Sequence, residues 1–265
     1  MPVQAVRYDV ADHVAHVQLN RPEQRNALNL EAYRQLEAAF HSAQRDPEVR
    51  VVVLSGVDPA FCSGDDVKEI MAGPARESSV ASLRQIRPRA TPAAIAVLEC
   101  DRPVIAAVNG PAVGWGMDLA LFCDLRIASE RARFGELFVK RGLVSDLGGL
   151  WRLPDIVGPS KAAELLFTGD LIDAKEAERI GLVSQVVAHD SLVAAARTLA
   201  TKIAANPPLA VRYLKEGLRR ARFTSDPHEL GAWISQTLGI LFQTEDHREG
   251  VAAFLEKRTP VFKGR

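Results

Sequence analysis

Two glycine-containing loops constrain this chain more than any other feature of its sequence. The first covers Ala60 to Lys68 and the second covers Asn109 to Asp118. Each follows an apolar run typical of a buried strand, Val51 to Leu54 and Val104 to Val108, and each leads into a segment that can start a helix. A glycine-rich turn entering a helix exposes backbone N–H groups that no helical carbonyl can accept. Two such turns brought together can hold one negatively charged oxygen between two N–H groups.

Composition narrows the class of protein. A chain of 265 residues with 47% apolar residues can form one large domain or two small ones around a genuine core. Its formal net charge of zero argues against a nucleic-acid-binding protein, which usually carries a basic surplus. No apolar run is long enough to span a membrane, and the N-terminal residues lack the pattern of a secretory signal. We therefore expect neither nucleic acid nor membrane as a partner. The cysteines described next lead us to expect a cytoplasmic protein.

The three cysteines are Cys62, Cys100 and Cys123, and each lies in or beside an apolar run. Their number is odd and their spacing is not that of metal ligands. We expect buried, reduced thiols and no metal site.

Strand and helix patterns alternate in the first half of the chain, and helix patterns gather in the second. Residues 3–8 and 13–19 predict a hairpin, and Asn29 is a good N-cap for a helix over residues 30–44. Residues 73–93 carry Gly, Pro, Ser and Arg with little apolar order, which favours a mobile segment. After Gly135 the pattern is mostly helical, and from Leu192 onward it predicts only helices. These patterns indicate an α/β core followed by a C-terminal helical segment.

The two loops, in this order and with their flanking residues, resemble the signature of the crotonase superfamily, also called the enoyl-CoA hydratase/isomerase family. The resemblance covers nearly the whole chain. Its other matching stretches are Asn20 to Pro22, Asn26 to Asn29, Cys123 to Ala128, Phe134-Gly135, Gly148-Gly149, Arg152-Leu153, Leu166 to Gly169, Ala177 to Val183 and Phe254 to Arg258.

The resemblance implies an enzyme that acts on acyl-CoA thioesters. It implies a spiral core of repeated ββα units, which we assign to residues 1–205, and a C-terminal helical trimerisation region, residues 206–265, as parts of one functional unit. A homotrimer or a dimer of trimers is the expected assembly. No metal or redox cofactor is implied, because coenzyme A is part of the substrate.

Carried over by position, the family's oxyanion-hole donors are the backbone N–H groups of Asp65 and Trp115. Both residues depart from the commonest types, alanine and glycine, but the role survives because the donor is backbone. The indole of Trp115 either narrows the acyl pocket or is an aromatic side chain of the core.

The resemblance also places coenzyme A and substrate along both loops and a few other positions. One of Asp65 and Asp66 is expected to cap the helix that begins near Val67. Arg25 and Lys68 either meet the CoA phosphates or are surface charges. Phe254 and Lys257 match positions that complete the site in the family, sometimes from a neighbouring subunit. The full set of expected binding residues is Arg25, Ala27, Leu28, Cys62, Gly64, Asp66, Val67, Lys68, Gly114, Phe138, Phe254 and Lys257.

The carboxylates distinguish between the reactions of the family. Typical hydratases carry two glutamates, and their positions fall on Asp118 and on Phe138, which cannot transfer a proton. Glu136 lies two residues earlier and, on a helix, would point away from the Phe138 face. Asp146 resembles the acid of dienoyl-CoA isomerases and of ring-opening isomerases, and the dienoyl enzymes also carry aspartate at the position of Asp118. The alternative for Asp146 is an N-cap of a helix starting at Leu147.

These residues favour double-bond isomerisation of an enoyl-CoA, with Asp146 as the main acid/base and Asp118 as its partner. An isomerase only removes a proton at one carbon and returns it at another, and Phe138 would exclude water. Three alternatives stay open. They are hydration by the pair Asp118 and Asp146, hydrolysis with Ser63 as nucleophile and no histidine placed to activate it, and a catalytically silent CoA-binding protein.

Overall fold

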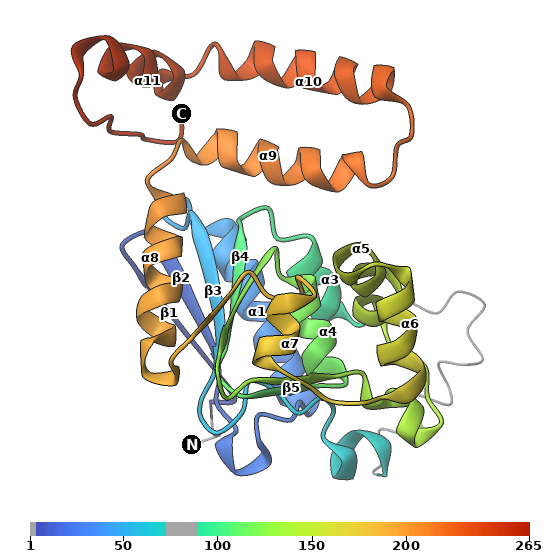
Figure 1. Ribbon diagram of the computed structural model, residues 1–265. Helices are drawn as coiled ribbons and strands as arrows, with labels where there is room; N and C mark the ends of the chain where they lie inside the picture. The colour runs from blue at the N-terminus through green and yellow to red at the C-terminus, as the bar shows by residue number, and fades with distance from the viewer. Residues whose placement is uncertain (1–3, 73–89) are drawn as a thin grey trace.

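A computed structural model describes residues 4–72 and 90–265 of the protein (Figure 1). The segment for which the sequence predicts mobility, residues 73–93, lies mostly outside the described residues. Helix α3 (Pro92–Leu98) begins within the last two residues of this segment.

The main sheet has six strands in the order β1-β2-β3-β4-β6-β9. The first two form the predicted antiparallel hairpin, with the turn at Asp12 and His13, where φ is positive. Every later strand pairs in parallel with its neighbour. The strands are β1 (Val6–Ala11), β2 (Val14–Leu19), β3 (Val51–Gly56), β4 (Val104–Val108), β6 (Leu125–Ser129) and β9 (Gln185–Val187).

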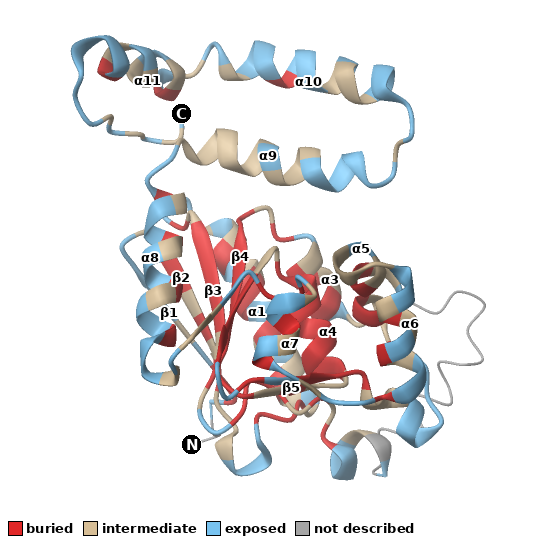
Figure 2. Cartoon of the chain, viewed as in Figure 1, coloured by how far each residue is buried: buried red, intermediate tan, exposed pale blue. Residues whose placement is uncertain are grey.

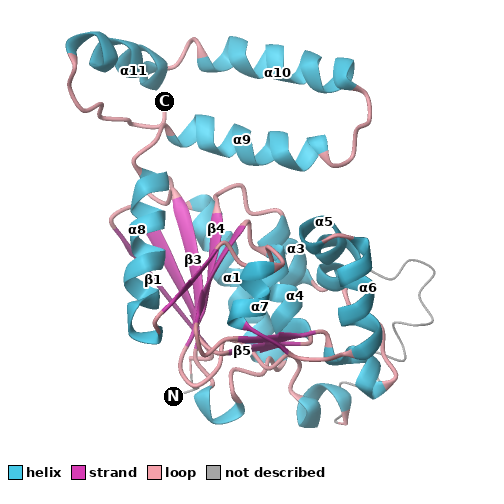
Figure 3. Cartoon of the chain, in the orientation of Figure 1, coloured by secondary structure: helices cyan, strands magenta, loops and turns pink. Residues whose placement is uncertain are grey.

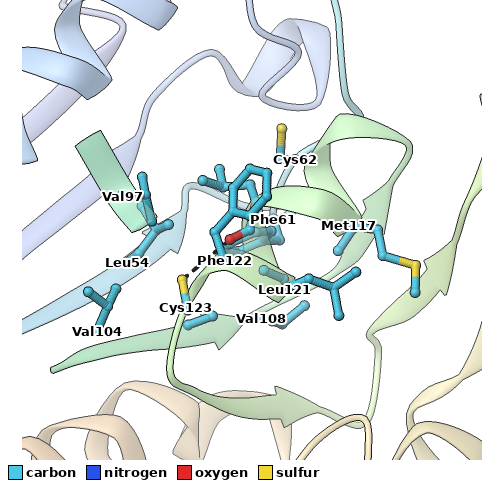
Figure 4. Packing of buried hydrophobic residues seen from close by; sticks show 14 of the residues in the cluster. Leu54, Phe61, Cys62, Val97, Val104, Val108, Met117, Leu121, Phe122 and Cys123 are labelled. Atoms are coloured by element: carbon cyan, nitrogen blue, oxygen red, sulfur yellow. Dashed lines mark hydrogen bonds between the residues drawn. The ribbon is translucent and has the colours of Figure 1, made fainter. Parts of the chain in front are cut away.

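Helices cover both faces of the central part of this sheet, which is why β3 and β4 read as continuous apolar runs. Val51 and Val53 of β3 face α8 (Leu192–Ala204). Val52 and Leu54 face the opposite way, toward the larger core cluster (Figure 4). That cluster packs against α1 (Leu30–Arg45), α3 and α4 (Trp115–Phe122).

Asn29 caps α1 as predicted, because its side-chain oxygen accepts a hydrogen bond of 2.9 Å from the Ala32 N–H. The segment after the second glycine turn starts a helix as expected, and α4 begins at Trp115. The three cysteines are buried and free, in line with the sequence.

A second sheet of three short strands, β5 (Pro111–Val113), β7 (Arg133–Gly135) and β8 (Ile172–Asp173), lies beside the main one (Figure 3). The sequence pattern misses β5, β8 and β9, because two or three residues are too few to show a strand period. Helices α5 (Leu153–Val157), α6 (Pro159–Thr168) and α7 (Ala174–Arg179) complete the core region.

The last three helices, α9 (Pro208–Ala221), α10 (Pro227–Leu241) and α11 (Glu245–Glu256), extend beyond the end of α8 (Figure 1). Pro208 lies in the first turn of α9, where its missing N–H leaves no helical hydrogen bond unmade. None of the residues of α9 is buried (Figure 2), and its Leu214 and Leu218 are 67% and 73% exposed. Within the described residues, we find no helix with the length and apolar character to cross a bilayer.

Candidate active site

The two glycine loops leave the main sheet at the same edge, because β3 and β4 are parallel neighbours. Backbone hydrogen bonds then join them. The Cys62 N–H donates to the Pro111 carbonyl at 3.1 Å, and the Val113 N–H donates to the Cys62 carbonyl at 3.0 Å. Gly116 lies so close to this junction that a Cβ would sit 2.1 Å from the Cys62 carbonyl oxygen. The loop pairing therefore requires glycine at that position.

Two unused N–H groups lie where the loops meet. Gly64, with φ of +87°, directs the chain into Asp65, and Gly114, with φ of +55°, directs it into Trp115. A Cβ on Gly64 would lie 3.3 Å from the Trp115 nitrogen, so the two donor positions are neighbours. Trp115 opens α4 and has no helical acceptor. Within residues 4–72 and 90–265, no acceptor is present for either N–H. The arrangement is that expected of an oxyanion hole.

The segment around Arg25 supports the first loop through its backbone. The Leu28 N–H donates to the Gly64 carbonyl at 2.8 Å, and the Ser63 N–H donates to the Arg25 carbonyl at 3.1 Å. Buried Asn26 binds the carbonyls of Val57 and Ala60, each at 2.7 Å. These bonds bring the expected CoA-binding residues Arg25, Ala27 and Leu28 alongside the expected ones of the first loop, Cys62 and Gly64.

Asp66 is the carboxylate that caps η2 (Val67–Met71), with Oδ1 accepting from the N–H groups of Lys68 and Glu69 at 3.2 and 3.3 Å. Its Oδ2 pairs with Arg21 at 3.0 Å, and the pair is largely buried. Asp66 therefore has a structural role, while Val67 and Lys68 are exposed on the short helix it begins.

The side chain of Asp65 turns toward α1. Tyr33 donates its hydroxyl hydrogen to Asp65 Oδ1 at 2.5 Å. Burial raises the pKa of Asp65, the hydrogen bond from Tyr33 opposes this rise, and the charge of Asp146 adds to it. Burial and the charge of Asp65 also raise the pKa of Tyr33 well above its usual value.

The indole of Trp115 is buried and has a polar partner that the sequence does not reveal. Its ring lies edge-on to Tyr33 and Phe122, with centroid distances of 4.8 and 5.9 Å. Its Nε1–H donates to Asp146 Oδ2 at 3.1 Å. Trp115 is thus a core aromatic that also orients the predicted acid/base.

Asp118 and Asp146 lie together. Asp118 is completely buried and accepts hydrogen bonds from the Gly149 N–H at 2.5 Å and the Asp146 N–H at 3.3 Å. Burial, followed by the charge of Asp146, raises the pKa of Asp118 to about 7. A Cβ on Gly148 would lie 2.2 Å from Asp118 Oδ1, so glycine permits this close approach.

Asp146 is partly exposed, in contrast to Asp118. Its Oδ1 accepts from the Leu147 N–H at 2.8 Å, and its carbonyl accepts from the Leu150 N–H at 3.2 Å. The residue therefore begins the helical segment that continues into η4 (Gly148–Arg152), while its Oδ2 faces Trp115. The carboxylate of Asp146 can therefore cap this helical segment with one oxygen and face the glycine loops with the other.

Glu136 is a third buried acid at this site, and the sequence argument missed it. It precedes η3 (Leu137–Arg141) with φ and ψ of −87° and 77°, so it is not helical and the helical-face reasoning does not apply. Its Oε2 accepts a hydrogen bond of 3.2 Å from Ser145, which also donates to Asp118. Only the fold brings residues 118, 136 and 145 together.

Phe138 lies beside the second loop, since its ring carbons are 4.0 Å from where a Cβ of Gly114 would be. Phe254 and Lys257 lie on and directly after α11, which Figure 1 shows well apart from α4. Phe254 is 82% exposed. This chain alone does not bring these two residues to the loops, and their role in the site stays a prediction that needs a second copy.

Comparison with known proteins gives consistent matches. Residues 9–265 match the family described as "Enoyl-CoA hydratase/isomerase". The chain is 40% identical to (E)-benzylidenesuccinyl-CoA hydratase of Thauera aromatica, over 98% of this chain and 99% of that one. It is 39% identical to 2,3-dehydroadipyl-CoA hydratase of Escherichia coli, covering 93% and 94%. Among solved structures, enoyl-CoA hydratase from Bacillus anthracis superposes with a TM-score of 0.91 at 36% identity, over 99% of this chain and 100% of that one.

Proposed function

Because the chain belongs to the enoyl-CoA hydratase/isomerase family of the crotonase superfamily and has its fold, we propose that it is an enoyl-CoA isomerase. The observation that carries this proposal is the contrast between two carboxylates. Asp146 is partly exposed next to the loop junction, whereas Asp118 is completely buried. Phe138 occupies the position of the second acid. One accessible carboxylate suffices to move a proton between two carbons, but hydration needs a second group to activate water.

In the proposed reaction, the thioester oxygen binds between the N–H groups of Asp65 and Trp115. Asp146 removes a proton from the acyl chain, the two donors stabilise the enolate, and Asp146 returns the proton at another carbon. One oxyanion-hole donor is worth about 2.7–4 kcal/mol, and a positioned acid/base about 10²–10⁴-fold in rate. Trp115 holds Asp146 in place through its indole N–H.

Hydration of a 2-enoyl-CoA is the second candidate. The relatives at 40% and 39% identity are both named hydratases. Asp118 and Asp146 supply two adjacent carboxyl groups, and the pKa of Asp118 at about 7 is suited to an acid/base. This mechanism requires substrate or water to reach Asp118, which is completely buried in the free protein.

Ser63 does not favour hydrolysis. Its hydroxyl donates to the Gln24 carbonyl at 3.2 Å, and no histidine is bonded to it in the described part of the chain. A catalytically silent CoA-binding protein is the remaining alternative, and turnover excludes it.

The test is to mix the purified protein with 2-enoyl-CoA and 3-enoyl-CoA esters and to record product mass and ultraviolet spectrum. An unchanged mass with a moved double bond supports isomerisation. A gain of one water on the 2-enoyl ester overturns it in favour of hydration. Release of free CoA indicates hydrolysis, and binding without turnover of any ester indicates a silent protein. Asp190→Asn, an exposed change on η5 (His189–Ser191), is the matched control for variants of the site aspartates.

We further propose that the chain assembles as a homotrimer or a dimer of trimers through α9–α11. Large apolar side chains are exposed on these helices, including Leu214, Leu218 and Phe254. A cavity of about 670 Å³ between α9 and the core is lined by Trp151 and Leu218, among others. Exposed apolar surface of this kind favours association. Sedimentation equilibrium of the wild type and of Leu218→Glu tests the proposal, and a monomeric wild type overturns it.

A further inference from the structure

A single hydroxyl connects two buried carboxyl groups beneath the site. Ser145 Oγ lies 3.3 Å from Asp118 Oδ1 and 3.2 Å from Glu136 Oε2. It also lies 3.2 Å from the Asp146 carbonyl oxygen. A serine hydroxyl has one hydrogen, so it can donate to only one of these acceptors at a time. If Asp118 and Glu136 were both ionised, one of the two carboxylates would face the Ser145 oxygen with no hydrogen between the two atoms.

The two carboxyl groups have different surroundings. Asp118 receives N–H bonds from Gly149 and Asp146 in addition to Ser145, and such donors stabilise an anion. Glu136 has only Ser145, and its Oε1 is buried with no hydrogen-bond partner in the described residues. Glu136 is 1% exposed, so bulk solvent does not reach its carboxyl group. An ionised carboxylate is costly in such a place, whereas a protonated one is not.

We propose that Glu136 is a protonated positioning residue that donates its hydrogen to Ser145, which in turn donates to ionised Asp118. The pair of carboxyl groups then holds one proton and one negative charge. This order satisfies Ser145 as both acceptor and donor, and it leaves Asp118 free to accept the Asp146 backbone N–H at 3.3 Å. Glu136 thus acts on the reaction only through Ser145, Asp118 and the placement of Asp146, and this role rests on the proposed function.

The charges around Glu136 agree with this assignment. The acidic groups that face it are Asp118 of α4 and Asp146, which precedes η4. Burial, followed by the charge of Asp118, raises the pKa of Glu136 well above its usual value. The cations of the neighbouring elements are bonded elsewhere. Lys140 pairs with Asp170, and Arg133, Arg141 and Arg152 donate to the carbonyls of Ala132, Leu137 and Leu121.

Infrared spectroscopy of the full chain tests the proton directly and does not require turnover. At pH 8 we expect a carbonyl stretch of a protonated carboxylic acid. It should shift when the glutamate side-chain carboxyls carry ¹³C, stay unchanged when the aspartates carry it, and disappear in Glu136→Gln. A band that shifts with the aspartate label, or no band at pH 8, overturns the proposal. Glu164→Gln, at an exposed position of α6, is the control that leaves the band in place.

Kinetics then test the positioning role. The amide of Glu136→Gln keeps a donor toward Ser145 without a titratable proton, so kcat at neutral pH should stay within about threefold, since a neutral hydrogen bond is retained. Any fall of kcat at alkaline pH caused by ionisation of Glu136 should disappear in this variant. Ser145→Ala breaks the connection and should lower kcat by about tenfold with little change in KM. Equal kcat values for Ser145→Ala and wild type overturn the positioning role, even if the infrared result holds. Absence of turnover in the wild type contradicts the proposed function and leaves the infrared test intact.

Discussion

The proposed active site has two halves, one built from backbone N–H groups and the other from side-chain carboxyl groups. The proposed oxyanion half consists of the backbone N–H groups of Asp65 and Trp115, which glycines and hydrogen bonds between the loops fix in place. The proposed acid/base half consists of the carboxyl groups of Asp118 and Asp146, with Ser145 and Glu136 as positioning residues behind them. The backbone N–H groups of Asp146 and Gly149 hold Asp118.

This difference explains why residue types can change in the backbone half but not in the acid/base half. A backbone donor survives a change of side chain, so aspartate and tryptophan can stand where alanine and glycine are common in the family. A side-chain acid does not survive such a change. The reaction therefore depends on which carboxyl groups remain, and the predictions below test each half separately.

The largest effect is expected from Asp146→Asn, which removes the proposed acid/base. The single amide oxygen of asparagine can still accept from Trp115, at the cost of the bond from the Leu147 N–H. We expect kcat to fall about 10³-fold, within the range for loss of a positioned acid/base, with little change in KM. Steady-state kinetics on the enoyl-CoA ester that the wild type converts measure this. Asp190→Asn, which is exposed, should keep wild-type activity. A loss of less than about threefold would move the acid/base role to Asp118.

Gly116→Ala should disrupt the junction of the two loops, on which the backbone half depends. The added Cβ would lie 2.1 Å from the Cys62 carbonyl oxygen, so one loop must move. We expect a destabilisation of about 3 kcal/mol in urea unfolding, at the upper end for overpacking. Gly239→Ala in α10 is the matched control, because a Cβ there meets nothing within 4 Å. It should stabilise the chain by about 0.5–1 kcal/mol. Similar effects at both positions would show that the loop junction is not rigid.

The sequence predicts the backbone half far better than the acid/base half, for a physical reason. The strands before the loops, the cap by Asn29 and the cap by Asp66 each depend on residues close in sequence. Glu136 joins Asp118 only through tertiary packing, and the bond from Trp115 to Asp146 spans 31 positions. Strands of two or three residues, such as β8, lack a readable period and depend on pairing with distant partners.

Trp115 belongs to both halves, because its backbone N–H is in one and its indole contacts Asp146 in the other. Trp115→Phe tests the two contributions separately. The variant keeps the backbone N–H that we assign to the oxyanion hole, whereas the indole N–H bond to Asp146 is lost. We expect kcat to fall about tenfold, in keeping with the loss of one hydrogen bond to a charged group. Trp233→Phe in α10 controls for the loss of an indole. A loss as large as that of Asp146→Asn would mean that Asp146 cannot work without its partner, and an unchanged kcat would mean that its position is set by the backbone alone.

The smallest expected effect is on the free energy of unfolding, which burial of Asp118 in the acid/base half should lower at high pH. The folded-state pKa of Asp118 is raised to about 7, so between pH 4 and 7 the folded chain binds more protons than the unfolded chain at this residue. Its contribution to stability is therefore greatest below the unfolded pKa and is lost as pH rises toward 7. Asp118→Asn should remove this slope and raise the free energy of unfolding at pH 8 by about 1 kcal/mol, less than the full shift because charged hydrogen bonds are also lost. Urea unfolding of both proteins from pH 4 to pH 8 measures it, with Asp190→Asn expected to follow the wild type. The opposite result is a free energy of unfolding that rises with pH in the wild type but not in Asp118→Asn. It would indicate that the hydrogen bonds from Gly149 and Ser145 outweigh the effect of burial on Asp118. Asp118 would then be a structural anion rather than half of a proton-sharing pair.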